Sequence, residues 1–129
     1  MVNWRRLCLI LAACCFASPG PARSLGLNIR SAVVLKAGQW RDDSHGEKTP
    51  ADCAEFHLSA PRALTWLRTA KVVKKQTWNE VLDWSQCSAS GMLVTVDGRR
   101  RAWNIENWGR GLIFISPTQT IYLSGRTLP

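Results

Sequence analysis

The chain has few of the residues from which metal sites and hydrolytic active sites are built. Its 129 residues include only two histidines, His45 and His57, and neither a Cys-x-x-Cys nor a His-x-x-x-His spacing occurs. A zinc site needs three or four ligands at recognisable spacings. The serine-containing run at residues 88–91, Ser-Ala-Ser-Gly, departs from the G-x-S-x-G nucleophile elbow. The sequence therefore indicates neither a metal site nor a cofactor, and it favours a noncatalytic protein over an enzyme.

No apolar run is long enough to cross a membrane. The first one, residues 7–17, follows Arg5 and Arg6 and is shorter than the roughly 20 residues that a transmembrane helix needs. It has the size of the hydrophobic region of a secretory signal, and Gly20 and Ala22 offer small residues at positions −3 and −1 of a cleavage site. We therefore expect residues 1–22 to be a cleaved signal peptide, with no transmembrane span left in a periplasmic or secreted protein. Cleavage after Ala17 is the nearest alternative.

The cysteines support this route but leave a second one open. Cleavage after Ala22 removes the first three of five cysteines and leaves Cys53 and Cys87, an even pair that an oxidising compartment favours. We predict a disulfide between them. The run Leu-Ala-Ala-Cys ending at Cys14 also resembles the lipobox of bacterial lipoproteins, which would anchor the protein to a membrane through Cys14 and leave Cys15 as an odd thiol.

Acidic residues are scarce, with 9 against 17 lysines and arginines. From Arg23 onward the chain keeps 15 basic residues and all the acidic ones, which gives a formal net charge of +6. A small basic exported protein is attracted to anionic surfaces such as lipid head groups, lipopolysaccharide, nucleic acid or an acidic protein. Nucleic acid is a candidate partner that no motif supports. The charge predicts kinds of partner and says nothing about the fold.

The apolar pattern of residues 53–129 predicts an α+β domain: a small antiparallel sheet of about four or five strands, with one main helix packed on one face and one disulfide. Residues 87–115 contain Asp97-Gly98 between two β-rich runs, a typical two-residue hairpin turn. Such a turn pairs Met92 with Trp103 and places Met92, Val94, Trp103 and Ile105 on one face. Two further strands are predicted at residues 112–115 and 120–123.

The patterns of the remaining segments are less specific for one type of secondary structure. Alternation over residues 53–58 is typical of a half-buried strand, and Ser59 is a suitable N-cap for a helix that ends near Val73. Residues 23–52 are expected to form an N-terminal segment and a polar loop, in which residues 31–35 are either a strand or a helical turn. The pattern of residues 77–84 fits a helix or an irregular strand.

The strongest candidate for a binding surface is basic and aromatic. Arg99, Arg100 and Arg101 follow the predicted turn, and Trp108 and Arg110 are close in sequence. Arginines interleaved with aromatic side chains can bind phosphates, acidic sugars or stacked bases. Charge at a hairpin tip also serves solubility and discourages edge pairing. The leading hypothesis is a noncatalytic exported protein of the bacterial envelope that contacts an anionic envelope component or an acidic partner protein through these residues.

Two alternatives use other properties of the chain. Glu55 and His57, two residues apart on the predicted strand, could act as base and acid in a small secreted toxin-like nuclease. An immunity or inhibitor protein that masks another protein has no distinguishing composition. Binding to a polyanion should weaken steeply with salt, whereas a tight protein interface should persist.

Overall fold

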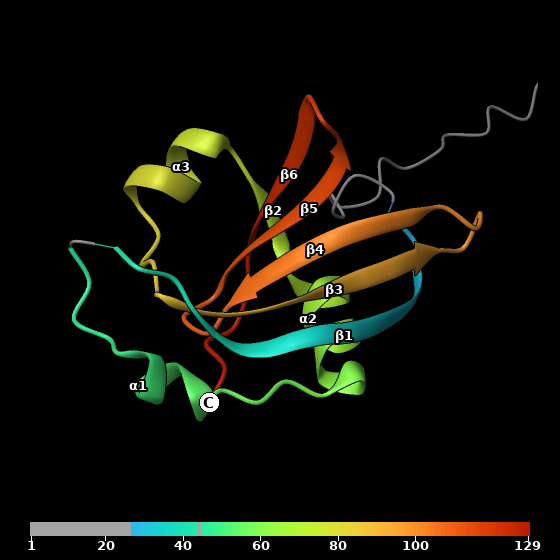
Figure 1. The fold of residues 1–129 in the computed structure, drawn as a ribbon. Coiled ribbons are helices and arrows are strands. Elements are labelled where there is room, and N and C mark those ends of the chain that lie inside the picture. Colours follow the sequence, from blue (N-terminus) through green and yellow to red (C-terminus); the bar gives the residue numbers. More distant parts are fainter. Residues whose placement is uncertain (1–26, 44) are drawn as a thin grey trace, which may run out of the picture.

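The chain folds as one antiparallel sheet with three helices in a computed structural model that describes residues 27–43 and 45–129. The predicted signal peptide and Cys14 lie outside the described residues. The strands are β1 (Ile29–Trp40), β2 (Lys71–Val73), β3 (Cys87–Thr95), β4 (Arg100–Glu106), β5 (Arg110–Ser116) and β6 (Gln119–Ser124), in the spatial order β1-β3-β4-β5-β6-β2 (Figure 1). The predicted α+β class and antiparallel sheet are confirmed, with six strands instead of four or five and three helices instead of one main helix.

The helices are α1 (Pro50–Ala54), α2 (Ala60–Thr69) and α3 (Lys75–Glu80). Ser59 caps α2 as predicted, because its hydroxyl oxygen accepts a hydrogen bond from the Arg62 N–H at 3.4 Å. The helix ends at Thr69 instead of near Val73, since Val72 and Val73 pair with β6. Of residues 77–84, for which helix and strand were both possible, 77–80 belong to α3 and 81–84 form neither a helix nor a strand.

The strand predicted over residues 53–58 was wrong. Thr49 and Asp52 form a capping box, in which each side chain binds the other's backbone N–H, and this box starts α1. Cys53 is therefore helical, and the chain continues through residues 55–59 without joining the sheet. Phe56 and Leu58 are nevertheless buried, as the alternation implied. The apolar residues were recognised correctly, but their spacing fits an extended connection as well as a strand.

Residues assigned to the N-terminal segment contribute the longest strand. β1 pairs with β3 along its length, but the register of the pairing shifts at three places. Gly38 adopts a φ of +62° where β1 passes α1, and a Cβ there would lie 2.8 Å from the Cys53 carbonyl oxygen. Lys36 and the irregular register protect this edge strand from pairing with another chain.

The core lies between α2 and one face of the sheet (Figure 1). Trp66 of α2 sits on Gly111, where a Cβ would come within 2.5 Å of its ring, and its indole N–H donates to the Arg126 carbonyl at 2.9 Å. Glycine at position 111 therefore makes room for the largest side chain of the helix. The other buried apolar residues include Ala63, Leu67, Ala70, Ala89, Leu93, Trp103, Ile105, Ile113, Ile121 and Leu123.

The register of the central hairpin differs from the prediction by one residue. Met92 pairs with Ala102, and Trp103 pairs with Gly91. The loop holds three residues, Val96 to Gly98, because the Thr95 N–H bonds to the Arg99 carbonyl at 2.9 Å and Gly98 takes a φ of +85°. Trp103 and Ile105 face α2 as predicted. Met92 and Val94 lie on the opposite face, since a slip of one residue turns every side chain over.

The predicted disulfide is present. Cys53 and Cys87 are joined with a Cα–Cα distance of 4.9 Å, and both are buried. The bond ties α1 to the first residue of β3 and closes a loop with a sequence separation of 34. It therefore fixes the polar connection between β1 and α2 to the sheet.

Replacing both cysteines, Cys53→Ala with Cys87→Ala, should lower the free energy of unfolding by about 4 kcal/mol, because the unfolded chain regains the freedom of that loop. Urea unfolding of the oxidised native protein and the double variant measures the difference. A change below about 1 kcal/mol would show that α1 is held by packing alone.

Candidate anion-binding surface

The β3–β4 hairpin presents its arginines on two sides of the sheet. Arg100 pairs with Val94 and Arg101 pairs with Leu93, so the two side chains alternate. Arg99 and Arg101 line a hollow of about 530 Å³ with Leu27 and Asn28, which precede β1, and with residues of β5 and β6. Arg100 points to the other face. The three arginines predicted as one patch therefore stay close together but divide into a pair and a single residue.

The hairpin is attached firmly to the body of the protein. The Val96 N–H donates to the Asn28 carbonyl at 2.8 Å, which joins the loop to the chain just before β1. Within the loop, the Thr95 hydroxyl donates to the Asp97 carboxylate, and the Arg99 N–H donates to the Thr95 hydroxyl at 3.1 Å. Asp97 also pairs with Arg99 at 3.2 Å on the surface. Exposed pairs of this kind contribute little energy, so Arg99 can change partners at small cost.

Two further arginines lie at this end of the sheet. Arg68 of α2 donates to the Ile29 carbonyl through Nε at 3.0 Å and Nη2 at 2.8 Å, and Arg30 is the next residue. Ile29 pairs with Thr95 at the base of the hairpin. Sequence reasoning missed Arg30 and Arg68, since only the sheet register and the crossing of α2 bring them to the hairpin.

The acidic residues collect at the other end of the sheet. All nine are in the described ranges, and Asp97 is the one at the hairpin. Three segments surround the starts of β3 and β5: the loop that follows β1, the helix α1, and the segment that follows α3. This end of the molecule is opposite the β3–β4 hairpin (Figure 1). The eight residues of this acidic end are Asp42, Asp43, Glu47, Asp52, Glu55, Glu80, Asp83 and Glu106. The carboxylates are therefore concentrated at one end of the strands, where Arg41, Lys48 and Arg110 also lie.

Trp108 lies at the acidic end, because the β4–β5 turn is at the far end of β4 from the arginines. Its side chain is 44% exposed, and Lys48 Nζ lies 5.7 Å from its ring centroid. The structure does not bring Trp108 beside Arg99, Arg100 and Arg101. The prediction that it contacts a partner is untested, but such a contact would be a separate one.

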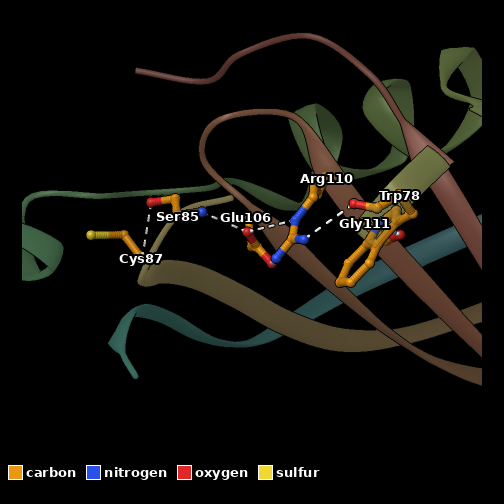
Figure 2. A network of polar contacts seen from close by, with 6 residues as sticks. All are labelled: Trp78, Ser85, Cys87, Glu106, Arg110 and Gly111. Atoms are coloured by element: carbon orange, nitrogen blue, oxygen red, sulfur yellow. Dashed lines mark hydrogen bonds and ion pairs between the residues drawn. The ribbon is translucent and has the colours of Figure 1, made fainter. Parts of the chain in front are cut away.

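Arg110 is buried and fully engaged, so its guanidinium does not lie on a contact surface. It binds Glu106 through two hydrogen bonds, Nε to Oε1 at 3.1 Å and Nη2 to Oε2 at 2.8 Å, with the two side chains 7% and 5% exposed. The guanidinium also stacks on Trp78, 3.7 Å from its ring centroid, and donates to the Trp78 carbonyl (Figure 2). Sequence proximity suggested a binding role, whereas the contacts make Arg110 structural.

The same network continues to the disulfide. Glu106 Oε1 accepts from the Ser85 N–H at 2.7 Å, and the Ser85 hydroxyl accepts from the Cys87 N–H at 3.1 Å (Figure 2). Trp78 donates its indole N–H to the Gly111 carbonyl at 3.1 Å. A single buried carboxylate therefore connects the β4–β5 turn, α3 and the start of β3.

The pair proposed for nuclease chemistry lies apart from the hairpin arginines. Glu55 and His57 are exposed on the connection between α1 and α2. The hairpin arginines are at the opposite end of the sheet from α1, so they do not lie where they could hold a phosphate beside Glu55 (Figure 1). Within residues 27–43 and 45–129, no group of three or more His, Cys, Asp or Glu side chains could hold a metal ion.

No family model matches the chain, and comparisons with curated proteins and with solved structures found no match. None of the helices that the structure describes is long and apolar enough to cross a membrane.

Replacing Glu106 by Gln should lower the free energy of unfolding by about 3–5 kcal/mol, because Arg110 would remain charged and buried without its partner. Chemical denaturation measures the loss. Glu80→Gln is a suitable control, since Glu80 is exposed and its replacement should change stability by less than about 0.5 kcal/mol. Equal effects of the two substitutions would contradict the role assigned to the buried pair.

The Thr95 hydroxyl, more than any other group, holds the pKa of Asp97 below its ordinary value; burial raises the pKa, and the charge of Arg99 lowers it. Thr95→Val should raise the pKa of Asp97, as carboxyl NMR would measure. Because the folded-state pKa is the lower one, this contact stabilises the hairpin above about pH 4 and its contribution is lost as the pH falls through the folded-state value. Thr118→Val should leave Asp97 unchanged, and an unchanged pKa in Thr95→Val would disprove the assignment.

Proposed function

We propose that this protein is a noncatalytic exported binding protein of the bacterial envelope, which contacts an anionic envelope component or an acidic partner protein through its hairpin end. The binding surface consists of Arg99, Arg100 and Arg101, with Arg30 and Arg68 beside them. Export through a signal peptide, with lipidation at Cys14 as the alternative, is part of the proposal. The disulfide between Cys53 and Cys87 agrees with an oxidising compartment.

The observation that carries the proposal is the near absence of carboxylates around the hairpin arginines. Five arginines share the hairpin end with one carboxylate, Asp97, while the other acidic residues gather at the opposite end. Such a distribution orients the protein as it approaches an anionic surface and raises the rate of encounter. A charged tip that served only solubility would not require the acidic residues to be excluded from its surroundings.

The hairpin also provides a rigid support for the contact. Its loop is attached to Asn28, and its strands lie in the middle of the six-stranded sheet. Arginine is suited to phosphate and carboxylate groups because its planar guanidinium donates two parallel hydrogen bonds. The proposal therefore needs no rearrangement of the fold.

Charge reversal at the paired arginines, Arg99→Glu with Arg101→Glu, should weaken binding to vesicles of anionic phospholipid by at least about thirtyfold, since each basic residue near such a surface contributes about 1 kcal/mol. Vesicle co-sedimentation at low and high salt measures the effect. The native protein should lose most of its affinity at high salt.

The matched control is Lys74→Glu with Lys75→Glu, which makes the same change in net charge at exposed residues around the start of α3. If both double variants lose affinity equally, binding follows net charge and the hairpin is not the contact. If capture from envelope extract instead recovers one protein that remains bound at high salt, the partner is a protein and not a polyanion. The inhibitor alternative would then be favoured.

A further inference from the structure

The face of the sheet opposite α2 carries an apolar strip that the corrected register creates. Met92 pairs with Val33 on one side and with Ala102 on the other, and Ala102 pairs with Phe114. Side chains in register on neighbouring strands lie on the same face. The four residues thus form a continuous row across β1, β3, β4 and β5. A second row on the same face runs through Lys36, Ser90, Asn104, Leu112 and Tyr122.

The strip is open to solvent over much of its length. Val33 is 52% exposed and Phe114 is 41% exposed. Leu35, the next residue of β1 on the same face, is 66% exposed. The helix α3 covers only the far side, where Trp78 meets Tyr122 with ring centroids 5.6 Å apart. Between α3 and β1 the face forms a groove of about 510 Å³, floored by Met92, Ala102, Leu112 and Phe114. This volume lies within the range of small-molecule sites.

The groove has a polar side and an excess of positive charge. Its hydrogen-bonding side chains include those of Gln39, Ser88, Ser90 and Asn104, and its charged residues are Lys36, Arg41 and Glu106. Glu106 is already neutralised by Arg110. The charges left to act on a ligand are therefore both cationic.

We propose that this groove binds a single-chain lipid with an anionic head group. The acyl chain lies across Met92, Ala102 and Phe114, and the head group is held by Lys36 and Arg41. An apolar floor with cations at one side complements such an amphiphile. An extended peptide is less suited to the site, because the irregular register of β1 disfavours addition of another strand.

This site is independent of the hairpin surface. Arg99 and Arg101 line a hollow with Ile115, Ile121 and the two residues before β1, and neither arginine lines the groove. The lipid site would thus add a second anionic ligand, recognised mainly by its apolar chain. The two proposals can fail separately.

Calorimetric titration of the lipid-free, oxidised protein with decanoate, dodecanoate and tetradecanoate, each below its micelle-forming concentration, tests the inference. Affinity should rise about fifteenfold for each pair of methylenes until the groove is filled, since each buried methylene contributes about fourfold. Dodecanol should bind more weakly than dodecanoate. Affinity that does not depend on chain length, or equal affinity for the alcohol and the acid, would overturn the proposal.

Variants locate the site. Phe114→Asp and Lys36→Glu with Arg41→Glu should each reduce dodecanoate affinity by tenfold or more. The control Val81→Asp changes another exposed apolar residue outside the groove and should bind like the native protein, as should Arg99→Glu with Arg101→Glu. Circular dichroism confirms that each variant is folded. Loss of dodecanoate binding in the Arg99 and Arg101 variant, or none in Phe114→Asp, would place the ligand elsewhere.

Discussion

The structure depends on the register of the β3–β4 hairpin. A three-residue loop ending in Gly98 pairs Met92 with Ala102 and Gly91 with Trp103. Every side chain of the two central strands takes its face from this pairing. Trp103 and Ile105 consequently enter the core under α2, and Met92 is left on the open face. The same register decides which face of the sheet Arg100 and Arg101 each take, so the core, the arginine surface and the groove have one origin.

The sequence predicts the parts of the fold that local chemistry determines. Ser59 starts a helix because its hydroxyl caps the first turn, and the pairing of Cys53 with Cys87 was predictable because they are the two cysteines that follow the predicted signal peptide. The four strands from Cys87 to Ser124 follow from β-rich runs between turns. The loop length was not predictable from Asp97-Gly98, since this dipeptide suits both two-residue and three-residue turns. The error in register followed from that ambiguity.

The candidate site shows the same division between local and long-range information. Arg99, Arg100 and Arg101 are neighbours in the sequence and remain neighbours on the hairpin. Arg110 is only nine residues from Arg101, yet β4 carries it to the opposite end of the sheet, where Glu106 and Trp78 surround it. No spacing in the sequence distinguishes an arginine that binds a partner from one that fills a buried ion pair. The near absence of carboxylates around the hairpin arginines likewise appears only when the strands are aligned.

The most direct test of the account is a map of the contact surface. Backbone amide NMR shifts of the oxidised protein would be recorded during titration with small bilayer discs of anionic phospholipid, at low and at high salt. The account predicts that the largest changes fall on residues 95–101 and around Arg30 and Arg68, and that high salt removes them. Changes centred on Trp108 and the acidic end would contradict it.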